Sequence, residues 1–262
     1  MWSPSAPALA EPLTFPFEIV SNKIEITAMI NHRKSSAQID TGAYSTSITK
    51  KLADQSAVKP LEDAVPAKFV GAFSAGSSKF AYITTLELGD AVTLRNLPVF
   101  VRDPAEQNGE KFVMRDGRIQ LIGYNVAQRQ FLNIGMDLLR THSLKIDFDI
   151  NLITLSPRPL KLGPDSLALP MPVFRHSAYL IGNLDSADPE PFLLDTGLSS
   201  IGAININSEK DYSSSKIIDG DKHKVSDING KEKKVQSNRI GSLHFSNLRL
   251  ENPELDFAAL KR

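Results

Sequence analysis

The feature that most constrains this chain is a pair of Asp-Thr-Gly turns, each at the end of an apolar run. The first is Ala37-Gln38-Ile39-Asp40-Thr41-Gly42-Ala43, and the second is Phe192-Leu193-Leu194-Asp195-Thr196-Gly197-Leu198. An apolar run followed by this tripeptide predicts a strand that ends in a sharp turn, because glycine accepts backbone angles closed to other residues. Such a turn holds a carboxylate at a fixed, partly buried point. Two such turns in matching contexts predict a site built from both.

The composition excludes several kinds of partner and site. With 30 basic and 30 acidic residues, the formal net charge is zero, so no overall field attracts nucleic acid or an anionic membrane. Cysteine is absent, which excludes disulfides, thiolate nucleophiles and Cys-based zinc sites. No apolar run approaches the length of a membrane-spanning helix. At 262 residues, the chain is long enough for one large or two ordinary domains.

The residue pattern predicts mainly β-structure. Apolar residues alternate over residues 15–30, as in half-buried strands. Residues 50–57 predict a short helix, and residues 68–83 predict a β-hairpin around a Gly/Ser tip. Residues 102–117 predict a polar loop, whereas residues 119–131 fit no single period and stay unassigned.

A proline-rich stretch predicts a domain boundary. Residues 157–172 contain five prolines, a density that excludes a helix or central strand and suits a semi-rigid linker. The predicted organisation has four parts: a disordered or exported-protein tail (1–14), lobe one (15–156), the linker (157–172) and lobe two (173–262).

The second half of the chain repeats features of the first, which predicts an internal duplication. Gly89 and Gly241 follow their aspartates at similar distances, 49 residues (89 − 40) and 46 residues (241 − 195). One element has no counterpart. Gly135 lies 95 residues (135 − 40) after Asp40, so its equivalent would fall beyond the last residue, and we expect lobe two to be incomplete as given.

The N-terminus bears on the compartment. Ala8-Leu9-Ala10 has the small-x-small pattern of a signal-peptide cleavage site, without the charged and apolar segments that should precede it. We therefore expect a periplasmic or secreted protein rather than a cytoplasmic one. An ordinary disordered Pro/Ala tail is the alternative interpretation.

Two docked half-domains would bring the aspartates together about a pseudo-two-fold axis. Neighbouring carboxylates cannot both ionise easily, so the pair shares a proton. The ionised member can then take a proton from water while the protonated member polarises a carbonyl group. This chemistry hydrolyses peptides without a metal or a covalent intermediate, so we expect no cofactor.

These residues resemble the retropepsin-like aspartic proteases of bacteria, with two lobes joined as in pepsin-like enzymes. The resemblance is carried by Asp40-Thr41-Gly42-Ala43, Asp195-Thr196-Gly197, the hairpin around Gly71 to Gly76, and Ile134-Gly135-Met136-Asp137-Leu138-Leu139. It implies an all-β fold of two pseudo-symmetric β-barrel lobes with short helices. It also implies that Asp40 and Asp195 are catalytic, and that Thr41 and Thr196, with Gly42 and Gly197, brace the two turns.

The resemblance further implies β-hairpin flaps that close over bound peptide. The flap positions would be Gly71, Phe73 and Gly76 in lobe one, and Asn229 and Gly230 in lobe two. The chain departs from the family pattern in three ways. Leu198 replaces the usual Ala or Ser, neither flap has a tyrosine at an obvious tip position, and lobe two lacks its hydrophobic-hydrophobic-Gly segment.

The sequence therefore predicts an aspartic endopeptidase that acts on extended peptide or protein substrates as a monomeric pseudo-dimer. Two alternatives stay open: a non-catalytic peptide-binding protein on the same fold, and a protease active as a homodimer through lobe one.

Three weaker patterns favour structural explanations. The glycines of residues 71–78 are spaced as in a phosphate-binding loop, but Ser77 stands where lysine is required. Gly197-Leu198-Ser199 lacks the second glycine of a nucleophile elbow. The five histidines show no metal-ligand spacing, which favours isolated surface or core positions: His32, His142, His176, His223 and His244.

Overall fold

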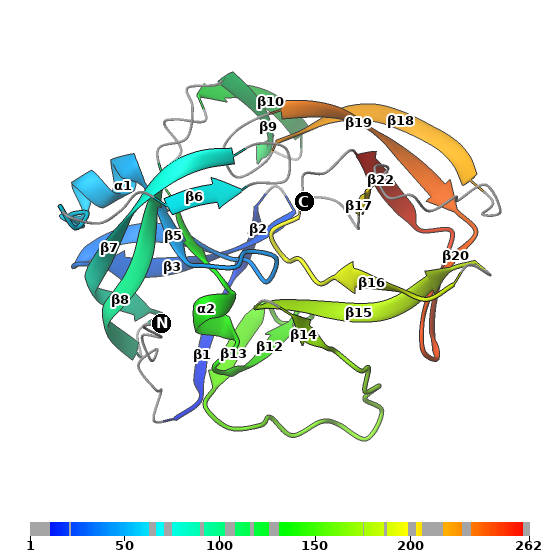
Figure 1. Cartoon of the computed structure of the whole chain (residues 1–262), viewed down its shortest axis with the longest axis horizontal. Coiled ribbons are helices and arrows are strands. Elements are labelled where there is room, and N and C mark those ends of the chain that lie inside the picture. Colours follow the sequence, from blue (N-terminus) through cyan, green and yellow to red (C-terminus); the bar gives the residue numbers. More distant parts are fainter. Residues whose placement is uncertain are drawn as a thin grey trace.

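The computed structural model confirms the predicted all-β fold (Figure 1). It describes residues 11–20, 22–62, 67–70, 75–89, 92–102, 108–115, 118–125, 131–174, 176–185, 188–198, 203–205, 217–226 and 232–258. We call residues 11–156 the N-terminal half and residues 173–258 the C-terminal half. Within the described ranges, no helix is long and apolar enough to cross a membrane.

Six strands of the N-terminal half close into a barrel, because β7 pairs with β3 as well as with β8. In order around the barrel, they are β3 (Lys23–Ile30), β4 (Arg33–Ile39), β11 (Leu132–Ile134), β5 (Ser47–Thr49), β8 (Val92–Arg102) and β7 (Ala75–Leu88). Two further strands extend the sheet, β2 (Glu18–Val20) beside β3 and β6 (Ala67–Val70) beside β7. Two short helices follow β5 and β11: α1 (Lys50–Gln55) and α2 (Met136–Leu139).

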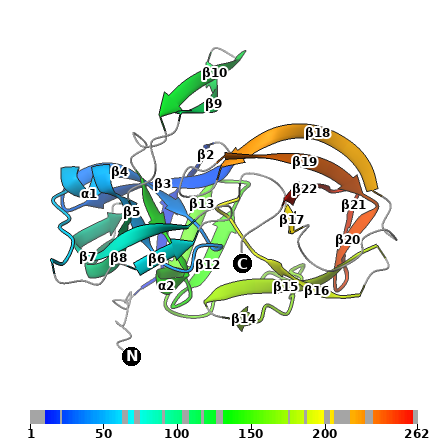
Figure 2. The ribbon, with the colours of Figure 1, turned by 45° about the horizontal axis from the view of Figure 1, so that its top comes forward.

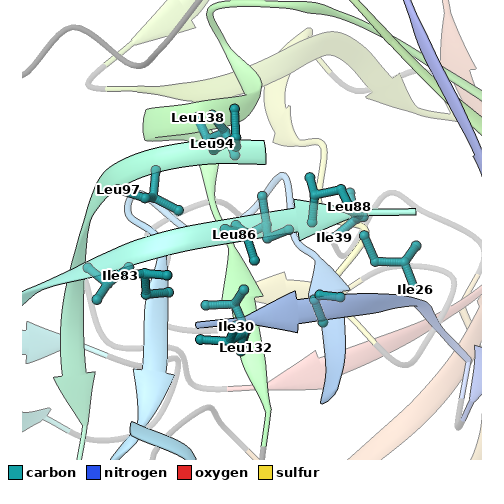
Figure 3. Packing of buried hydrophobic residues seen from close by; sticks show 14 of the residues in the cluster. Ile26, Ile30, Ile39, Ile83, Leu86, Leu88, Leu94, Leu97, Leu132 and Leu138 are labelled. Atoms are coloured by element: carbon teal, nitrogen blue, oxygen red, sulfur yellow. The ribbon is translucent and has the colours of Figure 1, made fainter. Parts of the chain in front are cut away.

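The predicted alternation explains how these strands form the core. In β3, every second side chain faces inward, and Ile30 is completely buried. Asn31 and His32 both take positive φ angles, which suits the tight turn into β4. Figure 3 shows how side chains from β3, β4, β7, β8, β11 and α2 pack together, with Ile39 among them. Because Ile39 is fully buried just before Asp40, the first Asp-Thr-Gly turn begins from a rigid strand.

A small antiparallel sheet corrects the predicted extent of the N-terminal tail. The sheet contains β1 (Leu13–Pro16), β13 (Leu152–Ser156) and β12 (Ser143–Asp147). Two residues of the expected tail, Leu13 and Thr14, therefore lie in a strand. The reason is burial, since the Leu13 side chain is 3% exposed and packs in the core.

The polar loop predicted over residues 102–117 is wrong. Arg102 ends β8, and β9 (Asn108–Arg115) pairs with β10 (Arg118–Asn125) as an antiparallel hairpin. Figure 2 shows this hairpin standing away from the rest of the ribbon. The same hairpin contains residues 119–125, which the periodicity had left unassigned.

The C-terminal half contains two sheets that follow residues 157–172, a stretch without helix or strand. The first sheet comprises β14 (Val173–Phe174), β15 (Ser177–Leu184), β16 (Glu190–Leu193), β20 (Ser242–Phe245) and β21 (Leu248–Glu251). The second comprises β17 (Ala203–Asn205), β22 (Glu254–Ala258), β19 (Glu232–Ile240) and β18 (Ile217–Ser226). Their buried core is small and includes Leu184, Ile240 and Leu243.

The two halves share a topological detail. In the N-terminal half, Ser47 of β5 pairs in parallel with Phe100 of β8. In the C-terminal half, Ala203 of β17 pairs in parallel with Asp256 of β22. These pairs lie at nearly equal distances after the two aspartates. The N-terminal barrel, however, places β11 between β4 and β5, and no described strand takes that place between β16 and β17.

Candidate active site

The two Asp-Thr-Gly turns lie face to face. A Cβ atom on Gly42 would overlap the Asp195 carboxyl group, and one on Gly197 would overlap the Asp40 carboxyl group. Each glycine is therefore required by a close approach, whatever its backbone angles. The predicted pair of carboxylates, 155 residues apart in the chain (195 − 40), meets at one point between the halves.

Four reciprocal hydrogen bonds hold the turns together. The Thr41 amide donates to Thr196 Oγ1, and the Thr196 amide donates to Thr41 Oγ1, both at 3.1 Å. The Thr41 hydroxyl donates to the Leu194 carbonyl at 2.7 Å, and the Thr196 hydroxyl donates to the Ile39 carbonyl at 2.9 Å. Each hydroxyl thus both accepts and donates across the interface, which fixes the separation of the two strands that carry the aspartates.

The hydrogen bonds around the two carboxylates differ. Asp40 Oδ1 accepts from the Gly42 amide at 3.0 Å and the Ala43 amide at 2.9 Å. Asp40 Oδ2 accepts from the Asn133 side-chain amide at 2.8 Å. Asp195 Oδ1 accepts from the Gly197 amide at 2.8 Å. The first carboxylate is therefore the better supplied with donors that favour its ionised form.

The surroundings of Asp195 favour its protonated form. Burial, the charge of Asp40 and the hydrogen bond between the two carboxyls raise the pKa of Asp195 to about 7. The Gly197 amide and the charge of Lys23 oppose that rise. Between its ordinary value of 3.8 and about 7, Asp195 therefore carries a proton that an exposed aspartate would have lost.

The segment containing β11 and α2 supports the first turn from below. The Asp40 amide donates to the Ile134 carbonyl at 3.0 Å, and the Met136 amide donates to the Ala43 carbonyl at 2.8 Å. A Cβ on Gly135 would lie 2.6 Å from the Ser45 carbonyl carbon, so only glycine fits there.

Asp137 anchors the same segment to the loop that follows the turn. Its carboxylate accepts the Thr46 hydroxyl at 2.7 Å and the Thr46 amide at 2.9 Å. Burial nevertheless raises the pKa of Asp137. The loop and α2 therefore form one hydrogen-bonded unit beneath Asp40.

Two site features were missed by the sequence patterns. Asn133 lies within a strand expected to be apolar, and only its place before Gly135 marks it in the sequence. His176, interpreted as an isolated histidine, stacks on Tyr44 with ring centroids 4.4 Å apart. Tyr44 is half exposed and lies four residues after Asp40, so this stack is a second contact between the halves near the aspartates.

The predicted flap residues lie mostly outside the described part of the chain. Gly71, Phe73, Asn229 and Gly230 belong to undescribed segments. Gly76 lies in β7, opposite Phe69 of β6, so the predicted hairpin of lobe one does form. Among the described residues, no three His, Asp or Glu side chains gather as a metal site.

The chain was compared with known protein families and solved structures. The family model described as "gag-polyprotein putative aspartyl protease" matches residues 26–129. The matched region contains Asp40 and excludes Asp195. A solved structure that also matches is a retropepsin-like aspartic protease from Rickettsia conorii, at 17% identity over 59% of this chain and 96% of that chain, with a TM-score of 0.36. None of the curated proteins matches the chain.

The family-model match over residues 26–129 supports the resemblance to retropepsin-like aspartic proteases that the Asp-Thr-Gly turns predicted.

Proposed function

We propose that the chain is an aspartic endopeptidase in which Asp40 and Asp195 activate one water molecule. The observation that carries this proposal is the meeting of the two turns, each glycine packed against the opposite carboxyl group. The raised pKa of Asp195 adds the second requirement, one proton held between the two carboxyls. Thr41 and Thr196 act as braces, through the four hydrogen bonds that join the turns.

The reaction follows from the unequal protonation of the pair. The Asp40 carboxylate takes a proton from water as the water oxygen attacks the peptide carbonyl carbon. Asp195 gives its proton to the carbonyl oxygen, and a neutral tetrahedral diol forms. Asp40 then passes its proton to the amide nitrogen, the C–N bond breaks, and Asp195 regains a proton from the collapsing diol. The enzyme returns to its starting state with one peptide bond hydrolysed.

Extended peptides are the proposed substrates, and the hairpin of β6 and β7 is the proposed flap. A peptide in a strand conformation can pair with strand edges beside the aspartates. We assign Gly71, Phe73 and Gly76 to this flap, and Asn229 and Gly230 to the corresponding hairpin of β18 and β19. We keep the proposed division into lobes at residues 157–172.

A hydrolysis assay on a diverse peptide library tests the proposal. We expect cleavage that falls as pH rises through about 7, where Asp195 loses its proton. Asp40→Asn and Asp195→Asn should each lower kcat by a factor of at least about 10³, because each removes one of two groups that act together.

Asp165→Asn is the matched control, since it removes one exposed carboxylate from the segment between the halves. It should cleave like the wild type. A well-folded wild type that cleaves no peptide between pH 4 and 8 would contradict the endopeptidase and leave the peptide-binding alternative.

A further inference from the structure

Among the described residues, Asp40 has two donors that Asp195 does not match, the Ala43 amide and the Asn133 side chain. Both turns supply a backbone donor from their glycine, Gly42 at 3.0 Å and Gly197 at 2.8 Å. Only the first turn is followed by a supporting strand in the described residues, and that strand contributes Asn133. Its amide nitrogen lies 2.8 Å from Asp40 Oδ2, the oxygen that the backbone donors leave free.

Burial makes this amide an unusual feature of the barrel. Asn133 is completely buried between Leu132 and Ile134, both also completely buried. Its Oδ1 atom has no hydrogen-bond partner in the described part of the chain. A buried acceptor without a partner is unfavourable, and a leucine of similar size would avoid that penalty. The position is therefore poor for stability, as positions with a functional role often are.

The neighbouring strand, β4, contains a second buried amide side chain. Gln38 lies opposite Asn133 in the parallel pairing of β4 and β11, and two residues before Asp40 on the same strand. It is 4% exposed, and its Nε2 atom also has no hydrogen-bond partner among the described residues. Two buried amides thus lie side by side under Asp40.

We propose that Asn133 is a positioning residue that places the negative charge of the pair on Asp40, so that Asp40 is the base and Asp195 the acid. The inference rests on the proposed function and deepens it. A neutral amide donor stabilises a carboxylate more than a carboxylic acid, because a hydrogen bond to a charged group is the stronger one. The donor acts before any substrate binds.

The other charged groups near the pair do not make this choice. Repulsion between the two ionised carboxylates raises the proton affinity of the pair as a whole. It does not determine which of the two residues is ionised. Lys23, at the start of β3, favours the ionised form of Asp195 and thus acts against the assignment. The Asn133 amide favours the ionised form of Asp40, whereas Lys23 favours the ionised form of Asp195. Removing the Asn133 amide should therefore change the titration of the pair measurably.

Carbon-13 NMR of aspartate-labelled protein tests the inference without requiring catalysis. The carboxyl carbons of Asp40 and Asp195 report the two apparent pKa values of the pair, and the Asp40 signal should follow the lower one. In Asn133→Leu we expect the lower apparent pKa to rise by about one to two pH units, the equivalent of one hydrogen bond to a charged group. The acid limb of kcat/KM should move by the same amount.

Two further variants keep the test decisive. Asn133→Ala removes the same donor with a different shape, so it should shift the lower apparent pKa in the same direction. Asn238→Leu removes another buried asparagine, 7% exposed, in the C-terminal half, and it should leave the titration unchanged.

An unchanged lower apparent pKa in folded Asn133→Leu and Asn133→Ala would overturn the inference. A uniform loss of activity with unmoved pH limbs would also overturn it, because that is the effect of a merely structural residue. A protein that titrates as expected but cleaves no peptide would contradict the proposed function and leave the role of Asn133 standing.

Discussion

Because Asp195 is buried beside Asp40, its protonation is linked to folding. The folded pKa of Asp195, about 7, lies above its ordinary value of 3.8. Between these values the folded chain binds a proton that the unfolded chain releases, so the free energy of unfolding falls as pH rises. The contribution of Asp195 is complete below pH 3.8 and is lost as pH passes through about 7.

Asp195→Asn should therefore change the pH dependence of stability. The amide cannot ionise, so the variant keeps its stability where the wild type loses it. We expect the Tm of the variant, relative to the wild type, to rise steadily from pH 4 to pH 7 and to level off above. Thermal unfolding at a series of pH values measures this difference. With Asp165→Asn the difference should be flat, and a flat curve for Asp195→Asn would show that Asp195 titrates normally.

Single residues also show where sequence patterns succeed and fail. The Asp-Thr-Gly turns could be predicted because three consecutive residues carry both the carboxylate and its bracing hydroxyl. Asn133 could not, because its partner Asp40 is 93 residues away (133 − 40) and the contact depends on the parallel pairing of β4 with β11. A polar residue in an apolar run is ambiguous until its neighbour in space is known.

At the scale of elements, the turn at Gly135 determines how β11 and α2 support Asp40. Gly135→Ala should destabilise the protein by about 1–3 kcal/mol, because the new Cβ meets backbone that cannot move cheaply. Since the Ile134 carbonyl holds the Asp40 amide, activity should fall with stability. Denaturant unfolding and the peptide assay measure the two effects.

The control for that substitution is Gly163→Ala in the segment between the halves. A Cβ there meets only the Ser166 hydroxyl, at 3.6 Å, so stability should change by less than about 0.5 kcal/mol. Equal effects of the two substitutions would contradict the supporting role of Gly135.

Elements with a regular alternation of apolar residues were predicted better than those without one. The alternation in β3 is visible because one face packs into the barrel core. β9 and β10 pair with each other, and their sequences show no strict alternation. The available signal was Asp116-Gly117, a dipeptide typical of hairpin turns, between two stretches of mixed polarity.

At the scale of the whole molecule, the question is whether one chain suffices for a site. Asp195 occupies the place beside Asp40 that a second copy of lobe one would otherwise take. We expect the active species to be a monomer by light scattering. We also expect an equimolar mixture of Asp40→Asn and Asp195→Asn to stay inactive, because neither chain contains an intact pair. Activity of Asp195→Asn alone would instead support the homodimer through lobe one.

The presence of both turns in one chain has a consequence for how the site can change. In a symmetric dimer every substitution appears twice, so an amide beside one aspartate would also lie beside the other. A single chain is free of that constraint. Its two turns can accumulate different neighbours, as Asn133 beneath Asp40 illustrates. Substitutions in the sequence can thus determine which aspartate is the acid and which is the base. In an identical pair, the two aspartates become different only when a substrate binds.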